Sequence, residues 1–269
     1  MKKLENVRKI IQNYDNFIID LWGVVHNGVN TNPGALKVID ELYKKKKKFT
    51  FLSNAPRPVS DVREFLIKKM KIKSKFLSNI LTSGEAAILS LKKFEYGKFF
   101  FHLGPDRDHK IYQGYEKYKT SILKCDYILC TGLYDHEMKN LSYYEKLLLG
   151  SEKKTMICTN PDLIVDRGNE QEYCAGTIAK IFEKIGGKVI YFGKPYKEIY
   201  DLLISKTEKV LIIGDNLRTD IKGANYLKKD SLFIMNGVHK NEIKKFKNLE
   251  TFFEKYNIKP NFIQNDLNW

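Results

Sequence analysis

Apolar runs rich in β-branched and aromatic residues alternate along this chain with segments whose apolar positions recur every three or four residues. A first run at residues 17–20 precedes a helical pattern at about residues 34–46. A second run at residues 49–54 precedes another helical pattern that extends through Met70. This alternation is typical of βαβ units, so it predicts an α/β fold built on a Rossmann-like, mainly parallel sheet.

The same alternation begins again near residue 81. Thr82 and Glu85 have the spacing of a capping box at the start of a helix, and further strand and helix patterns follow as far as Gly186 and Gly187. This middle block is long enough to be a domain of its own. We therefore predict a core domain made of residues 1–80 and 188–269, with a second α/β domain inserted at residues 81–187.

Composition adds an expectation about location. Hydrophobic residues make up 43% of the chain, which is ordinary for a globular protein. We find no run near the roughly 18 consecutive apolar residues that a membrane-spanning helix needs. The first residues include charged and amide side chains where a secretory signal would have its apolar region. We expect a cytoplasmic protein without a membrane partner. The four cysteines lie in apolar runs without a Cys-x-x-Cys pair, which favours reduced thiols over a zinc site.

The net charge of +15 is the one unusual bulk property. Nucleic-acid binding is one interpretation of such a charge, but the lysines are spread along the chain and no aromatic-interleaved basic motif accompanies them. The densest cluster, Lys44–Lys48, follows a helical pattern and is explained as a solvated helix end. The charge therefore favours small anionic ligands and makes a nucleic-acid partner unlikely.

Polar residues stand where several predicted strands end: Asp20, Ser53, Asn54, Lys194 and Asp215. In a parallel sheet these strand ends share one edge, where ligands of α/β proteins bind. Carboxylates there would hold a divalent cation, and a lysine with a hydroxyl would hold a phosphate. Main-chain amides at Gly23 and Asn54 would bind the same anion. Each feature alone is common in turns and caps, so the prediction depends on their joint occurrence.

Together with the segments GDNLRTD at residues 214–220 and TNPD at residues 159–162, these residues resemble the haloacid dehalogenase-like hydrolases. Within that family the order is similar to subclass IIA, in which a C2-type cap domain lies between the second and third motifs. The first motif matches at Asp20–Val24, the second at Ser53 and the third at Lys194. The resemblance covers nearly the whole chain.

The resemblance implies a Mg²⁺-dependent phosphatase of small phosphate monoesters, either sugar phosphates or nucleoside monophosphates. Asp20 would attack the phosphoryl group and form an aspartyl-phosphate. Mg²⁺ would be held by Asp20, the main-chain carbonyl of Trp22 and Asp215. Lys194 and Ser53 would bind the transferring oxygens, and Asp220 would fix Lys194 or a water on the metal.

The second residue after Asp20 departs from the family pattern. Typical phosphatases of the family have a second aspartate there as general acid and base, whereas this chain has Trp22. Three interpretations follow: a slow or specialised phosphatase, a protein that binds phosphate esters without efficient turnover, or transfer in place of hydrolysis. The sequence Asp-x-Trp-Gly-Val is similar to a variant branch of subclass IIA, which favours the first.

Two further sites have both a functional and a structural interpretation. His26 follows Trp22 closely and would supply the missing proton, or it is an ordinary loop histidine at the edge of the site. Asn160 and Asp162 would face the substrate from the inserted domain, or the segment only caps a turn. The sequence leaves these alternatives open.

Overall fold

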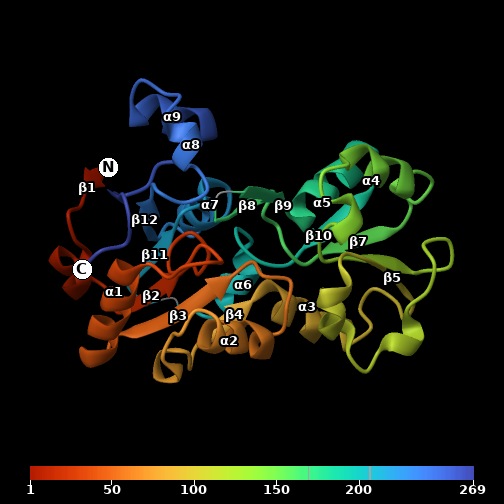
Figure 1. Ribbon diagram of the computed structural model, residues 1–269, viewed down its shortest axis with the longest axis horizontal. Helices are drawn as coiled ribbons and strands as arrows, with labels where there is room; N and C mark the ends of the chain where they lie inside the picture. The colour runs from red at the N-terminus through yellow and green to blue at the C-terminus, as the bar shows by residue number, and fades with distance from the viewer. Residues whose placement is uncertain (169, 206) are drawn as a thin grey trace.

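The computed structural model describes residues 1–168, 170–205 and 207–269, and it forms two α/β domains that lie side by side (Figure 1). Both ends of the chain belong to the core domain, and the chain enters and leaves the inserted cap domain once. This arrangement confirms the predicted α/β class with mainly parallel sheets.

The core sheet has seven strands among the described residues, in the order β1-β13-β12-β11-β2-β3-β4, and all neighbours are parallel. Its central strands are buried on both faces, as crossover helices require. In β2, Phe17 and Ile19 pack toward α1, whereas Ile18 packs on the opposite face. The strands are β1 (Lys2–Lys3), β2 (Asn16–Ile19), β3 (Lys48–Ser53), β4 (Ile80–Thr82), β11 (Val210–Gly214), β12 (Asp230–Ile234) and β13 (Phe262–Gln264).

Helices of the core domain cover both faces of this sheet. The first begins at a sequence signal: the Asn32 side chain accepts a hydrogen bond from the amide of Gly34 at 3.0 Å, and Pro33 takes the first helical position. The helices are α1 (Pro33–Lys44), α2 (Val59–Lys68), α6 (Lys197–Asp201), α7 (Lys222–Tyr226), α8 (Lys240–Ile243) and α9 (Leu249–Tyr256). The π-helical turn Leu217–Ile221 precedes α7.

The cap domain contains a parallel sheet in the order β10-β7-β6-β5 and a separate antiparallel hairpin, β8–β9. The hairpin lies between the two sheets in Figure 1. Thr82 starts α3 as predicted, since its hydroxyl accepts from the Glu85 amide at 3.0 Å. The elements are α3 (Ser83–Leu91), β5 (Phe100–Leu103), β6 (Tyr127–Cys130), α4 (Leu141–Leu148), β7 (Thr155–Cys158), β8 (Ile164–Arg167), β9 (Glu170–Tyr173), α5 (Ala175–Lys184) and β10 (Lys188–Tyr191).

Two expectations change. The second core segment, predicted to begin at residue 188, opens with β10. This strand pairs with β7 of the cap sheet, so we place the end of the cap at about residue 191 and not at residue 187. An apolar strand does not reveal from sequence which of two sheets it joins. Among the helix patterns predicted for the middle block, the one near residues 106–115 forms a 3₁₀ helix, Asp106–Tyr112. The 3₁₀ helices are Val7–Lys9, Ile11–Asn13, Ser74–Phe76, Asp106–Tyr112, Glu116–Tyr118 and Asp135–Glu137.

The structure bears on the helices and the cysteines. Across residues 1–168, 170–205 and 207–269, none of the helices combines the length and apolarity needed to span a bilayer. All four cysteines are free and buried in the cap domain: Cys125, Cys130, Cys158 and Cys174. Burial raises the pKa of the Cys130 thiol to about 12, so this thiol stays protonated near neutral pH.

Candidate active site

Parallel strands of the core bring three polar residues to one edge of the sheet. Asp20 directly follows β2, Ser53 ends β3, and Asp215 directly follows β11. The ladder holds the first of these in place, because the Asp20 amide donates to the Ile213 carbonyl at 2.9 Å. Residues about two hundred positions apart in the sequence therefore share one edge.

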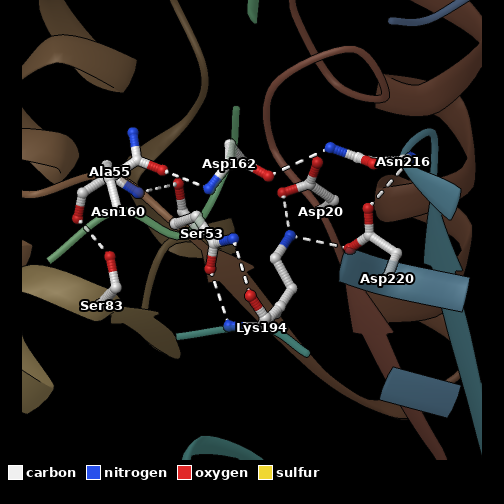
Figure 2. A network of polar contacts seen from close by, with 10 residues as sticks. Asp20, Ser53, Ala55, Ser83, Asn160, Asp162, Lys194, Asn216 and Asp220 are labelled. Atoms are coloured by element: carbon white, nitrogen blue, oxygen red, sulfur yellow. Dashed lines mark hydrogen bonds and ion pairs between the residues drawn. The ribbon is translucent and has the colours of Figure 1, made fainter. Parts of the chain in front are cut away.

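Lys194 reaches this edge from the segment that returns from the cap after β10. Its Nζ donates to Asp20 Oδ1 at 2.6 Å and to Asp220 Oδ1 at 2.7 Å (Figure 2). The Lys194 side chain is only 2% exposed. Burial alone would lower the pKa of this amine, but the carboxylates of Asp20 and Asp220 raise the pKa well above its usual value. Lys194 is therefore charged at neutral pH.

Three buried carboxylates crowd together beside this lysine. Asp20, Asp215 and Asp220 each place one oxygen within 4.8 Å of the others. At that separation one like-charge pair costs about 3 kcal/mol at an effective dielectric constant of 20. Burial raises the pKa of Asp20 above its usual value, and burial with the charge of Asp20 raises the pKa of Asp215 well above its usual value.

This donor set fits a divalent cation. Among the described residues the cluster forms ion pairs with one ammonium group, Lys194, so the carboxylates carry an excess of negative charge. Hard oxygen donors of this kind suit Mg²⁺.

The Asp215 carboxylate is fixed by main chain that approaches it closely. The Val238 amide donates to Asp215 Oδ2 at 2.7 Å, and an added Cβ at Gly23 or Gly237 would overlap the carboxylate. Gly23 has φ +82°, a conformation that favours glycine. The Gly23 amide donates to the His26 carbonyl at 2.8 Å. Contrary to the prediction, this amide is therefore not offered to a phosphate, and Gly23 instead leaves room for the Asp215 carboxylate.

On the other side of Lys194, the residues that follow β3 organise the loop. Asn54 Oδ1 accepts from the Lys194 amide at 2.8 Å, and Asn54 Nδ2 donates to the Lys194 carbonyl at 3.1 Å. Ser53 is 7% exposed and its Oγ accepts from the Ala55 amide at 3.2 Å. Asn54 thus fixes the backbone of Lys194, while Ser53 keeps a hydroxyl proton for another acceptor.

The TNPD segment brings cap residues to the same place. Asn160 Oδ1 accepts from the Asp162 amide at 3.1 Å, which forms a tight turn, and Asn216 Nδ2 donates to Asp162 Oδ1 at 3.1 Å. Figure 2 shows the Asp162 carboxylate beside Asp20. Burial raises the pKa of Asp162 to about 6. Asn160 therefore shapes the turn, and Asp162 is the cap carboxylate at the site.

Trp22 and His26 have structural contacts. The Trp22 Nε1 donates to the Asp166 carbonyl of β8 at 2.6 Å. His26 is buried between Trp22 and Phe65, and its Nδ1 accepts from the Gly28 amide at 3.0 Å. Burial lowers the pKa of His26 to about 4, so the ring is neutral near pH 7. These contacts favour the structural interpretation of His26.

A cavity of about 1040 Å³ lies between core and cap and opens onto the site. Asp20, Ser53 and Asp215 line it from the core, while Asp162 and the β8–β9 hairpin line it from the cap. Arg57 and Arg107 also face it, and Arg57 Nε donates to Asp108 of the cap at 2.9 Å. A small phosphate ester fits within this volume.

Some functional contacts were missed by sequence reasoning. Asn216, Gly237 and Val238 were not singled out, yet they hold Asp162 and Asp215. A signal existed for the glycine, because Asn236-Gly237 follows the apolar run of β12 just as the chosen polar residues follow their strands. The hydrogen bond from Trp22 to Asp166 had no such signal in the sequence, because it joins an indole to a main-chain carbonyl.

Comparison with known families identifies the family of this chain. A family model described as "Haloacid dehalogenase-like hydrolase" matches residues 17–116, and a second, of the HAD-hydrolase-like kind, matches residues 191–269. The first segment contains Asp20 and Ser53, and the second contains Lys194 and Asp215. The chain belongs to the haloacid dehalogenase-like hydrolases. Residues of the cluster described above therefore lie in both matched segments.

Individual relatives agree with this membership. The chain is 25% identical over 233 residues to the ribonucleotide monophosphatase NagD of Escherichia coli (strain K12), covering 83% of this chain and 88% of that protein. A haloacid dehalogenase-like hydrolase from Brucella suis 1330 aligns at TM-score 0.85 and 28% identity, covering 98% and 99% of the two chains. A possible sugar phosphatase from Cytophaga hutchinsonii aligns at TM-score 0.77 and 20% identity, covering 99% and 98%, which supports the fold.

Proposed function

We propose that this member of the family is a Mg²⁺-dependent phosphatase of small phosphate monoesters that works through an aspartyl-phosphate on Asp20. The observation that carries the proposal is the ion pair of Lys194 with Asp20 at 2.6 Å, inside an acidic cluster that opens onto the cavity. A nucleophilic carboxylate, a fixed cation and a further carboxylate for a metal are the groups that phosphoryl transfer needs.

The proposed reaction has two steps, and residues of the site take part in both. A carboxylate oxygen of Asp20 attacks phosphorus, a P–O bond forms to Asp20, and the bond to the ester oxygen breaks. The Lys194 ammonium and the Ser53 hydroxyl donate hydrogen bonds to the transferring oxygens. Water then attacks the aspartyl-phosphate, which releases inorganic phosphate and restores the Asp20 carboxylate.

The bound cation would supply positive charge that offsets repulsion between the Asp20 carboxylate and the dianionic phosphate. This chain contributes the two carboxylates of Asp20 and Asp215 and the position of the Trp22 carbonyl. Val238 and the close approach of Gly23 and Gly237 keep the Asp215 carboxylate in one orientation. Asp220 keeps Lys194 turned toward Asp20.

The leaving oxygen needs a proton, and the Trp22 indole offers none because its N–H is a weak acid that already donates to Asp166. In this proposal Asp162 supplies the proton from the cap side. Asp162 lies on the cavity wall beside Asp20, and its Oδ1 is held by Asn216. A carboxyl group in that place can also accept a proton from the water of the second step.

The cavity and the relatives support a substrate class. The cavity extends well beyond the volume of a phosphate, so a leaving group of sugar or nucleoside size fits. The related Escherichia coli protein is named a ribonucleotide monophosphatase. These observations support sugar phosphates and nucleoside monophosphates as the substrates to examine first.

A panel of phosphomonoesters with Mg²⁺ tests the proposal. We expect release of inorganic phosphate that is lost on chelation and falls at least a thousand-fold in Asp20→Asn, which keeps the shape of the side chain. The alternative is a phosphate-ester-binding protein with little or no turnover. It predicts ligand-dependent thermal stabilisation without phosphate release, and that result would overturn the proposed function.

A further inference from the structure

The indole of Trp22 connects the catalytic loop of the core to the cap. Trp22 lies two residues after Asp20, and its Nε1 donates to the main-chain carbonyl of Asp166 at 2.6 Å. The guanidinium carbon of Arg167 lies 5.1 Å from the centre of the indole ring, a cation–π geometry. Asp166 and Arg167 end β8, so both contacts are made with the β8–β9 hairpin.

The core holds the indole in one orientation. The ring of His26 packs edge-on against it with 5.1 Å between ring centres. Gly28 lies on another side of the indole, and an added Cβ there would come within 2.5 Å of the indole Cζ2. The φ of +84° at Gly28 also favours glycine. The amide of Gly28 is fixed in turn by His26 Nδ1. The indole therefore presents its N–H to the hairpin from a rigid support.

A second contact joins the same two segments. The Gly168 amide of the hairpin turn donates to the Asn27 carbonyl at 3.2 Å. Among the described residues, the loop at residues 21–32 and the hairpin thus meet at two hydrogen bonds and one cation–π contact. Because Asp166, Arg167 and Gln171 also line the cavity above Asp20, these contacts decide where one wall of the substrate cavity lies.

We propose that Trp22 is a positioning residue that docks the β8–β9 hairpin over the substrate cavity. The hairpin then contacts the leaving group, and the position two residues after the nucleophile serves cap closure in place of proton transfer. This explains a bulky indole beside the nucleophile, because an aspartate carboxylate has no donor for the Asp166 carbonyl.

The kinetic part of the test rests on the proposed phosphatase function. Trp22→Phe keeps an aromatic ring for Arg167 and His26 but removes the N–H. We expect KM for sugar phosphates or nucleoside monophosphates to rise about ten-fold while kcat changes less than three-fold. A fall in kcat with KM unchanged would overturn the positioning role.

The spectroscopic part does not depend on any activity. The chain has two tryptophans, and the other, Trp269, packs against the core domain near Lys45. In the Trp269→Phe background, Trp22 is the sole indole, and Arg167→Ala should shift its emission to the red and increase its quenching by acrylamide at least two-fold. Arg167→Lys should restore much of the original spectrum.

If the emission and quenching of Trp22 are the same with and without Arg167, the hairpin does not cover the indole and the proposal is wrong. If the spectra change as expected but no phosphomonoester is hydrolysed, the docking role stands and the proposed function fails. The Trp269→Phe protein itself serves as the folded reference, because residue 269 takes no part in the site.

Discussion

Single residues divide the work of the site between the two domains. Asp20, Lys194 and Asp215 belong to the core and its return segment, and Asp162 comes from the cap. Trp22 makes no contact that would transfer a proton, since its N–H donates to Asp166. We infer that the one aspartate in the first motif acts as a nucleophile while proton transfer is left to another carboxyl group.

Asp162→Asn tests that division. The amide side chain still accepts from Asn216, so the turn should keep its shape, but it cannot give up a proton at neutral pH. We expect kcat for alkyl phosphates to fall about a hundred-fold, within the usual range for general acid catalysis. For p-nitrophenyl phosphate, whose leaving group needs no proton, kcat of the variant should fall less than five-fold. An equal loss for both substrates, measured as phosphate release, would contradict the assignment.

A second residue-scale prediction concerns stability and pH. Burial lowers the pKa of His102 from 6.5 to about 4, with a smaller contribution from Lys119. The unfolded chain therefore binds a proton between pH 6.5 and pH 4 that the folded protein excludes, and stability falls as pH drops through this range. A full shift of this size corresponds to at most about 3 kcal/mol.

His102→Gln removes this linkage and keeps a partner for Thr131 Oγ1, which lies 2.9 Å from His102 Nε2. We expect the melting temperature of the wild-type protein to fall by several degrees more than that of the variant between pH 6.5 and pH 4. Thermal unfolding followed by circular dichroism measures this difference. Parallel pH dependences for the two proteins would show that His102 does not contribute.

The site residues at strand ends could be predicted because their position depends only on the sheet being parallel. Asp20, Ser53 and Asp215 meet for that reason. The uses of Gly23 and Trp22 could not be predicted. The role of Gly23 depends on how closely the Asp215 carboxylate approaches it, and the role of Trp22 depends on a main-chain carbonyl of the other domain. Neither contact leaves a pattern in the sequence.

At the scale of elements, the start of α3 supports the loop that carries Asn54. The Gly84 amide donates to the Ala55 carbonyl at 3.1 Å, and Ser83 Oγ donates to the same carbonyl at 3.0 Å. An added Cβ on Gly84 would lie 2.6 Å from the carbonyl carbon of Pro56. The helix and the loop therefore approach each other as closely as their backbones allow.

Gly84→Ala should push this loop away from the site. We expect a loss of about 1–3 kcal/mol in stability, typical of overpacking, and at least a ten-fold loss of kcat because Asn54 no longer fixes Lys194. Gly132→Ala is the matched control, since its added Cβ would touch Pro105 Cδ at an ordinary 3.4 Å. Equal thermal unfolding and phosphate release for wild type and Gly84→Ala would refute this account of α3.

Elements were predicted unevenly, for a physical reason. Buried strands such as β3, β6 and β11 are apolar runs, and their sequences reveal them. The β8–β9 hairpin is more polar and has no fully buried residue in its strands, so these strands lack that signal. The cap boundary was misplaced because β10 is as apolar as a core strand and only its pairing with β7 identifies its sheet.

At the scale of the whole molecule, the acidic cluster couples metal binding to folding. The buried carboxylates of Asp20 and Asp215 repel each other in the folded protein and separate when it unfolds. A cation that binds only the folded state stabilises it by about 2.7 kcal/mol at a hundred times its Kd. We expect millimolar Mg²⁺ to raise the melting temperature of the wild-type protein by several degrees.

Asp215→Asn should abolish that Mg²⁺-dependent shift while raising stability without metal, since it removes one of the repelling charges. Differential scanning calorimetry of both proteins, with Mg²⁺ and with a chelator, makes the comparison. A shift of the same size in the variant would place the cation elsewhere in the molecule.

The central claim is that Asp20 becomes phosphorylated during turnover. The most direct test is rapid acid quench of the enzyme during turnover of a phosphomonoester that it hydrolyses with Mg²⁺, followed by mass spectrometry of the enzyme's peptides. The account predicts one added phosphoryl group on the peptide containing Asp20, absent from Asp20→Asn. Steady phosphate release with the label on a different peptide, or undiminished release by Asp20→Asn, would contradict it.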